Sequence, residues 1–374
     1  MKPSYLTWLH IFHKHLFLTF LFIIYSNIKC VLIALLIFMK KIINISFNHN
    51  NGGLSLDADL LGAILSKAGY RVWYNSFPMN FRGLSKRRLN IAKNLSSQFI
   101  RVLTYLSFLK VKPISITLHL EQIKLRQLNI SKKNIFIANL EWLMDESFAL
   151  FEKIDLFVCK TRDAESFFNE KGLPTFYTSF STISPFNGTY KQVSNTFVHI
   201  AGNSKAKGTI PLMKVWKKHP EWPELKVISR FTEHLTGLEA DNITLIGGYL
   251  PSDDLSAIQN QSEIHLCTSE AEGFGHYICE PLSCGAIVIT VDGYPMNELV
   301  QADRGVLINV KSSEPICYSK KFIFDPIDLE KKIERVLAMP ETEKLKLKEN
   351  ARKYFYKNNL FFKKRMLEAI NKTI

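Results

Sequence analysis

The sequence predicts an α/β protein made of two halves, each with its own parallel β-sheet. Its 374 residues exceed what one hydrophobic core usually organises, so two domains are expected. Strand-like apolar runs alternate with helical patterns, as in parallel sheets, and this alternation restarts after a loop-rich stretch near the middle of the chain. A glycine-containing loop follows a strand in each half, which is typical of sheets that bind ligands at their carboxyl ends.

The first half opens with a β-rich run at residues 41–47, which leads through Gly52 and Gly53 into a helical pattern that ends at Gly69. Apolar residues recur in that pattern at helical spacing. These elements predict a βαβ unit whose glycine loop lies at the carboxyl end of the first strand. The later strands of this half are predicted at residues 71–75, 114–120, 134–138 and 156–160, and its helices at residues 89–109 and 163–171.

A loop-like stretch at residues 179–194 contains proline, asparagine and glycine and is predicted to link the two halves. The alternation then restarts, and the chain ends in helices from residue 328 onward. Because ligands bind beyond the carboxyl ends of such strands, we expect the chemistry in the cleft between the halves. The strands of this half are predicted at residues 196–201, 225–229, 243–246, 264–268 and 286–291, and its first helices at residues 210–218 and 255–259.

The N-terminus leaves two interpretations open. Residues 16–39 are nearly all apolar and long enough to span a bilayer. In one interpretation they form a membrane anchor, for which the following Lys40 and Lys41 favour a cytoplasmic catalytic part. In the other, the true start of the protein is Met39, because the residues after it look like the opening strand of an α/β domain. We expect a hydrophobic segment at residues 1–38, an N-terminal domain at 39–185 and a C-terminal domain at 186–350. A final helix at 351–374 is expected to pack back on the N-terminal domain.

The chain is basic, with a formal net charge of +14. Between residues 82 and 133 many lysines and arginines accompany a single acidic residue, Glu121. This asymmetry predicts an anionic partner, and the basic and apolar residues 86–112 suggest a patch for an anionic membrane surface; a solvated basic face accounts for the charge equally well. No helix-turn-helix, zinc finger or RNP-like pattern is present, so no nucleic acid partner is expected.

The cysteines and histidines do not cluster at metal-ligand spacing. The six cysteines include no Cys-x-x-Cys pair, and buried free thiols are the simplest expectation. We therefore expect no metal site.

The most informative run is Ser-Glu-Ala-Glu-Gly-Phe-Gly-His-Tyr-Ile-Cys-Glu, residues 269–280. The preceding strand delivers the chain to a loop with two glycines, and a helix is predicted to begin near Gly275. Glycines let a ligand approach the backbone closely, and free amides at a helix start attract phosphate. Glu272 and Glu280 can address the same cleft, where carboxylates are strong acceptors for sugar hydroxyls.

This run resembles the Glu-x7-Glu motif of retaining GT-B glycosyltransferases of the glycogen-synthase-like and mannosyltransferase-like group, with Glu272 and Glu280 as its two acids. The next residues, 285–300, resemble that group's closing strand and loop, and residues 242–259 stand in the family's order. The resemblance covers residues 196–300 well and the N-terminal half loosely. It implies the GT-B fold, in which two Rossmann-like domains face each other across a cleft.

The resemblance implies a role for each residue of the motif. Glu272 is expected to touch the donor sugar near its reacting carbon, and Glu280 to hold the nucleotide ribose. Gly273, Phe274 and Gly275 are expected to offer backbone amides to the sugar and the diphosphate. Core packing is an equally good role for Phe274.

Residues 201–208 resemble the family loop whose arginine and lysine neutralise the leaving diphosphate. Lys207 matches the lysine, but Asn203 stands where the arginine is expected. An asparagine lacks the guanidinium fork, so Lys205 or Arg230 is a candidate for the second cation. A surface lysine in a β–α loop is the alternative role for Lys207. The other residues expected to bind the donor are Gly208 and Tyr249.

In the first half, Gly52 and Gly53 resemble the family's first glycine loop, which lies against the donor phosphates and the acceptor; a plain turn explains them equally well. His119 ends a predicted strand, and the resemblance places it on the far side of the donor, although a structural role is the commoner one for such a histidine. Asn139 and Glu141 follow another strand and suit acceptor hydroxyls, while a helix N-cap explains Asn139 equally well. The expected catalytic residues are Glu272, His119 and Lys207.

The expected function is transfer of a sugar from a nucleotide-sugar to a hydroxyl of a glycan or lipid-linked acceptor, with retention, in surface polysaccharide or glycolipid synthesis. The enzyme is expected to need no cofactor or metal ion. Two alternatives stay open: a nucleotide-sugar epimerase of the same fold, and a non-catalytic scaffold that binds a glycan or a protein partner. A cytoplasmic location is expected, with association or anchoring through residues 16–39 as the membrane-bound alternative.

Overall fold

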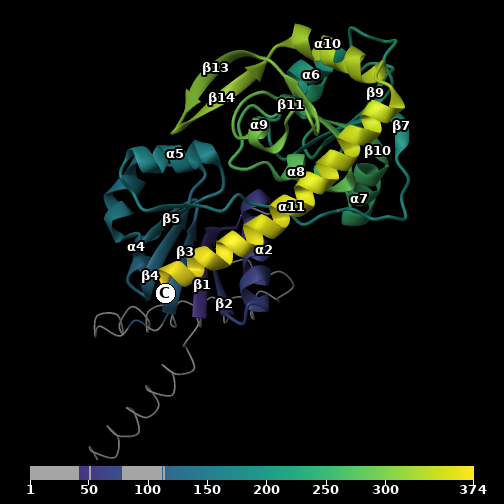
Figure 1. Ribbon diagram of the computed structural model, residues 1–374. Helices are drawn as coiled ribbons and strands as arrows, with labels where there is room; N and C mark the ends of the chain where they lie inside the picture. Colours follow the sequence, from purple (N-terminus) through teal and green to yellow (C-terminus); the bar gives the residue numbers. More distant parts are fainter. Residues whose placement is uncertain (1–41, 50–51, 78–111, 113) are drawn as a thin grey trace, which may run out of the picture.

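The computed structural model describes residues 42–49, 52–77, 112 and 114–374 (Figure 1). The described chain forms two lobes, each built on a six-stranded parallel sheet. The N-terminal lobe carries β1 to β6 and the C-terminal lobe carries β7 to β12. The predicted α/β class with two Rossmann-like units is therefore confirmed.

The sheet of the N-terminal lobe has the strand order β2-β1-β3-β4-β5-β6. Its strands are rich in isoleucine, phenylalanine and valine, and the inner strands β1, β3, β4 and β5 are largely buried, as is usual for parallel sheets. The strands are β1 (Ile42–Asn48), β2 (Arg71–Phe77), β3 (Ile114–Leu120), β4 (Ser131–Ile137), β5 (Leu156–Cys159) and β6 (Thr175–Tyr177). The helices between them are α2 (Gly53–Lys67), α4 (Leu125–Leu128), η1 (Leu140–Trp142), η2 (Asp145–Lys153) and α5 (Arg162–Glu170).

The sheet of the C-terminal lobe has the order β12-β11-β10-β7-β8-β9. Its strands are β7 (Val193–Gly202), β8 (Leu225–Ser229), β9 (Ile243–Gly247), β10 (Ser262–Cys267), β11 (Ile287–Val291) and β12 (Val306–Ile308). The helices are α6 (Thr209–Trp216), η3 (Glu233–Leu235), α7 (Ser252–Gln261), α8 (His276–Cys284), α9 (Met296–Leu299), α10 (Pro326–Leu337) and α11 (Glu341–Thr373). An antiparallel hairpin of β13 (Val310–Ile316) and β14 (Ser319–Phe324) stands apart from both sheets.

Each sheet reverses its winding direction at one point. In the N-terminal lobe the reversal lies between β1 and β3, and in the C-terminal lobe between β7 and β10. At such a point two neighbouring loops leave the carboxyl ends of the strands in opposite directions and open a crevice. The loops after these four strands are therefore where the fold places a ligand.

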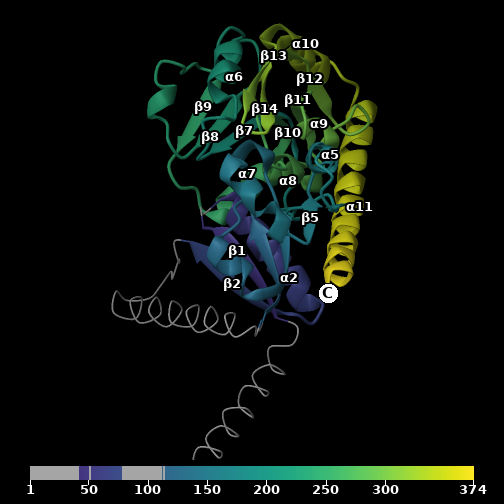
Figure 2. The ribbon, with the colours of Figure 1, turned by 90° about the vertical axis from the view of Figure 1, so that its left-hand side faces the viewer.

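Helix α11 runs along both lobes (Figures 1 and 2). At its start the buried Lys344 approaches Glu263 of β10, with 3.7 Å between Nζ and Oε2. Farther along, Asn358 donates to the carbonyl of Phe180 at 2.6 Å, and Tyr70 donates to Asn371 at 3.0 Å. One helix therefore forms hydrogen bonds with both lobes.

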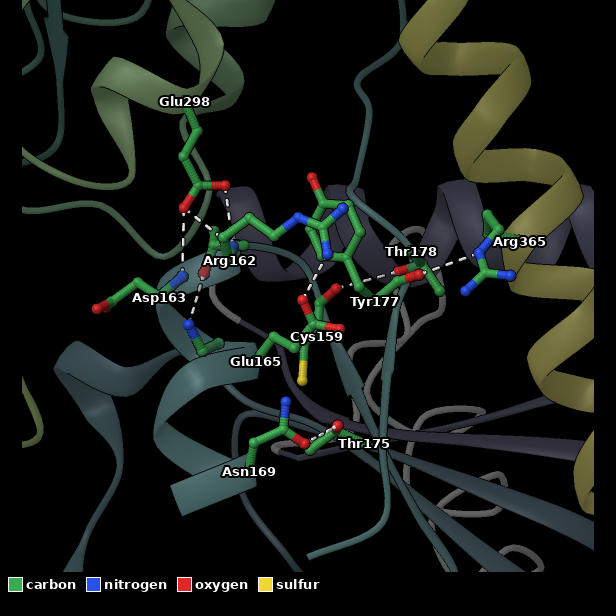
Figure 3. Close-up of polar contacts among 12 residues, drawn as sticks. Cys159, Arg162, Asp163, Glu165, Asn169, Thr175, Tyr177, Thr178, Glu298 and Arg365 are labelled. Atoms are coloured by element: carbon green, nitrogen blue, oxygen red, sulfur yellow. Dashed lines mark hydrogen bonds and ion pairs between the residues drawn. The ribbon is translucent and has the colours of Figure 1, made fainter. Parts of the chain in front are cut away.

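A carboxylate from the C-terminal lobe also caps a helix of the N-terminal lobe. Figure 3 shows Glu298 of α9 accepting hydrogen bonds from the backbone of Arg162 and Asp163 at the start of α5. The first amides of a helix lack partners inside the helix and attract negative charge. Figure 3 also shows Arg365 of α11 donating to the carbonyl of Tyr177 at 3.2 Å.

The structure corrects several sequence predictions. The β13–β14 hairpin was missed, because its alternating polar residues carry no strong apolar signal. The last helix begins at Glu341, before the predicted boundary at residue 351. Cys317 is exposed, whereas Cys159, Cys267, Cys279 and Cys284 are the expected buried free thiols. The helix predicted at residues 89–109, the hydrophobic residues 1–38 and the basic patch at residues 86–111 lie outside the described residues.

Candidate active site

The loops at the two reversal points carry most of the residues singled out from the sequence. In the N-terminal lobe, Gly52 and Gly53 follow β1, and Glu121 follows β3. In the C-terminal lobe, the loop of residues 203–208 follows β7 and the loop of residues 268–275 follows β10. The backbone amide of Glu270 donates to the carbonyl of Ala206 at 3.0 Å, so the latter two loops lie side by side.

Lys207 and Glu272 form an ion pair at this place. The side chains are 17% and 13% exposed, so the pair is largely enclosed. Ser269 donates from Oγ to Oε1 of Glu272 at 2.5 Å. The Lys207 ammonium also lies 3.7 Å from the ring centroid of Tyr277, whose hydroxyl accepts from the Ser269 amide at 2.8 Å. The ring face and the carboxylate both attract the ammonium group, and such a cation can also pair with an anion that enters the site.

The start of α8 supplies free backbone amides next to this pair. Gly275 caps the helix with φ of 110°, a conformation that side-chain-bearing residues avoid. Two turns later Glu280 accepts from Nε2 of Gln259 at 2.7 Å, and burial raises the pKa of its carboxyl. Phe274 is buried and packs against Phe180 with ring centroids 5.5 Å apart, so it belongs to the core.

Across the junction, two residues of the N-terminal lobe lie directly against Gly273. A Cβ placed on Gly273 would come within 2.5 Å of Cγ of Asn139 and 2.6 Å of Oε1 of Glu141. Only glycine allows this approach. Glu141 is 6% exposed, and burial, with a smaller effect of the Glu272 charge, raises the pKa of its carboxyl to about 8. The expected acceptor-side residues therefore meet the expected donor loop.

A chain of buried polar contacts joins the lobes beneath this meeting point. Nε2 of His276 lies 2.6 Å from Oδ1 of Asp57, and the other oxygen of Asp57 pairs with Lys160. Lys160 donates to Oδ1 of Asn139 at 2.9 Å, and Nδ2 of Asn139 donates to Glu121 at 3.2 Å. Glu121 has φ of 64°, a rare conformation that often marks functional positions.

Sequence reasoning missed four members of this chain: Glu121, Lys160, Asp57 and His276. Their one common signal is that each lies within a few residues of a strand's carboxyl end or of a glycine loop. Their pairing depends on the approach of segments more than a hundred residues apart, as for Asp57 and Lys160, which no local pattern records.

Comparisons with known proteins identify the family and the fold of the chain. The family model for glycosyl transferases group 1 matches residues 164–354, more than half of the chain, and includes the loops around Lys207 and Glu272. The chain belongs to this glycosyltransferase family. Curated protein sequences give no significant match.

Several solved structures have the same fold as this glycosyltransferase. A glycosyltransferase from Rickettsia africae aligns with a TM-score of 0.66 and 12% identity, over 89% of this chain and 98% of the other. Sucrose-phosphate synthase from Thermosynechococcus elongatus aligns with a TM-score of 0.64 and 14% identity, over 88% and 98% of the two chains. The Anabaena protein HepE, solved with UDP and glucose, aligns with a TM-score of 0.61 and 12% identity, over 88% and 99%. These are GT-B proteins, and the chain shares their architecture.

One expected catalytic residue of the glycosyltransferase has no exposed surface. His119 is fully buried in β3, and its Nε2 lies 3.1 Å from Oδ1 of Asn134. Burial lowers the pKa of its imidazole to about 4, so the ring is neutral. With no exposed surface and a hydrogen bond to Asn134, His119 fits the structural role that was the alternative to a place beside the donor.

The remaining expected donor residues follow β7 and β9 of the C-terminal sheet. Asn203 is exposed in the loop after β7, and Gly208 caps α6 with φ of 66°. Tyr249 follows β9 and is 79% exposed. Arg230 donates its backbone amide to the carbonyl of Gly202 at 2.9 Å, which places it beside the loop that lacks the arginine.

Among the residues that the structure describes, no three histidine, cysteine, aspartate or glutamate side chains are grouped to hold a metal ion. Within the same residues, no helix combines the length and the apolar character needed to cross a bilayer. The apolar residues 16–39 are outside the described part of the chain.

Proposed function

We propose that this glycosyltransferase moves a sugar from a nucleotide-sugar to a hydroxyl of a glycan or lipid-linked acceptor, with retention of the anomeric configuration. The proposal rests on one observation: Gly273 of the donor loop lies against Asn139 and Glu141 of the other lobe. A donor held by the loop and an acceptor held by the N-terminal lobe would react at that junction. Nucleotide-sugar donors are supported by the family itself.

In this proposal, Lys207 and the free amides at the start of α8 stabilise the negative charge of the departing diphosphate. Such fixed charges in an enclosed site supply much of the rate enhancement of group-transfer enzymes. Donor binding would draw Lys207 from its ion pair toward the diphosphate and free Glu272 for a sugar hydroxyl. Glu280, already bonded to Gln259, would accept from the ribose. The reaction is proposed to need no metal ion.

Arg230 is the better candidate for the cation missing at Asn203. Its backbone bond to Gly202 anchors it next to the loop that approaches the diphosphate, and an arginine side chain is long enough to reach into it. Lys205, within the loop itself, is the alternative. An arginine would restore the planar fork that suits phosphate oxygens.

We propose uridine as the nucleoside of the donor. HepE and a pneumococcal O-GlcNAc transferase of similar fold were both solved with UDP, so UDP is the first nucleotide to test. A lipid-linked or surface glycan acceptor, and contact with an anionic membrane surface, are supported by the net charge of +14.

The test compares two glutamate variants of the same loop in a panel of nucleotide-sugars, with product masses read by mass spectrometry. Glu272→Gln should lower turnover by about 100-fold or more while the unfolding temperature stays unchanged. Glu270→Gln is the matched control, because its carboxylate faces Lys321 at 3.2 Å instead. Near-normal turnover of Glu272→Gln would remove it from the site. Epimerised donor formed without acceptor would favour an epimerase.

A second arm tests the phosphate role of Lys207. Lys207→Ala should weaken UDP binding far more than uridine binding in calorimetry, because the ammonium is proposed to contact the diphosphate only. Equal losses for the two ligands would count against this role.

A further inference from the structure

The contact between His276 and Asp57 leads into a buried ion pair, because the second carboxylate oxygen of Asp57 pairs with Lys160. Asp57 is 2% exposed and Lys160 is 4% exposed, and the His276 side chain is 15% exposed. Removing charges from water costs several kcal/mol per ion. Pairing and hydrogen bonding offset that cost only in part, so a buried ion pair by itself does not indicate that the residues serve to stabilise the fold.

The contact joins two elements that both belong to the proposed donor site. Asp57 lies in the first turns of α2, directly after the Gly52–Gly53 loop, and His276 is the first residue of α8. A Cβ on Gly53 would lie 3.5 Å from Cδ2 of His276, so the imidazole touches the glycine loop. The rings of Phe180 and Phe274 enclose it, with centroids 6.1 and 5.7 Å away.

Asp57 is held in its charged form inside this enclosure. Burial by itself would raise the pKa of its carboxyl, but Lys160 and His276 outweigh burial, and the pKa lies below its ordinary value. Lys160 in turn reaches Asn139, which lies against Gly273. The buried group therefore contacts the glycine loop, the start of α8 and the donor loop together.

We infer that Asp57 is a positioning residue that acts through His276: it holds the first turn of α8 against the Gly52–Gly53 loop, so that both lobes together form the cradle for the nucleoside diphosphate. Lys160 supports Asp57 and links the cradle to Asn139. This inference rests on the proposed donor site. It assigns to the lobe junction a part in donor binding that Lys207 and Glu272 do not cover.

The test measures UDP binding by calorimetry and the donor KM and kcat for Asp57→Asn, His276→Leu and the double variant. We expect each single variant to bind UDP about 10-fold more weakly or worse, and the double variant to lose little more than His276→Leu alone, because residues acting as one unit are not additive. The donor KM should rise more than kcat falls.

The matched control is Glu298→Gln. Glu298 also bonds across the lobes, but at the start of α5 and not at the donor loop. It should bind UDP within about threefold of the wild type. If Glu298→Gln weakened UDP binding as much as Asp57→Asn, general loosening of the lobes would explain the effect and the inference would be wrong.

Asp57→Asn leaves Lys160 buried without its partner, so it can destabilise the fold. The double variant Asp57→Leu with Lys160→Met removes both charges and replaces them with apolar side chains. It should fold, and it should bind UDP more weakly than the wild type. UDP affinities equal to the wild type in this variant and in His276→Leu would overturn the inference and leave the proposed function intact. A wild type that binds neither UDP nor GDP nor ADP would overturn the donor site, and the inference with it.

Discussion

Replacement of Gly273 by alanine tests whether the two lobes must meet at the donor loop. The added Cβ would lie 2.5 Å from Cγ of Asn139 and 2.6 Å from Oε1 of Glu141, about 1 Å closer than ordinary contact between heavy atoms. Neither side chain can move freely. Asn139 is held by Lys160 and Glu121, and Glu141 is buried.

The clash lies between the lobes and not within either of them. Overpacking by one methyl group costs about 1–3 kcal/mol, and the variant avoids that cost by holding the lobes slightly apart. If catalysis requires contact between the lobes, the same cost is added to the activation free energy, and each 1.36 kcal/mol there lowers the rate tenfold. We therefore expect kcat/KM to fall by roughly 5- to 150-fold, while the unfolding temperature changes by only a few degrees.

The assay is release of nucleoside diphosphate from the donor found active in the panel, with thermal unfolding followed by circular dichroism. Gly188→Ala is the matched control, because a Cβ there meets Phe186 at an ordinary 3.7 Å in the linker between the lobes. A Gly273→Ala enzyme with kcat/KM within twofold of the wild type would refute the reasoning, since the closed contact would then have no part in the reaction.

Two further predictions concern the junction. Burial raises the pKa of Glu141 from 4.5 to about 8. The folded protein therefore keeps a proton that the unfolded chain has lost, and its free energy of unfolding falls as the pH rises from about 4.5 to 8. Denaturant unfolding across that range should show a smaller fall in this free energy for Glu141→Gln, and the same pH dependence in both proteins would contradict the prediction. Tyr318 at the tip of the β13–β14 hairpin packs on Phe148 and Phe167 of the other lobe, with ring centroids 4.9 and 5.4 Å away. Tyr318→Ala should lower the unfolding midpoint by about 2–4 °C, whereas Tyr318→Phe should keep most of the stability of the wild type. Equal midpoints for both variants and the wild type would show that this contact does not stabilise the two lobes.

The local sequence was sufficient for most of the architecture, because the strands are short apolar runs that end at glycines or polar residues. The predicted strands at residues 114–120 and 225–229 agree with β3 and β8 to the residue. The motif at residues 269–280 was recognisable for the same reason: a strand, a glycine loop and a helix start follow one another within a dozen residues. The hairpin at residues 310–324 was missed, because β13 is mostly exposed and polar and carries no strong apolar signal.

The tertiary structure decided which side chains share the site. The sequence left His119 either beside the donor or in a structural role, and in the folded chain it is buried next to Asn134. It gave no sign of the Asp57–His276 contact, which spans 219 positions, because that pairing depends on how two separately folded sheets approach each other. Spacing along the chain determines which residues follow a strand, but only the packing of the lobes determines which of those residues meet.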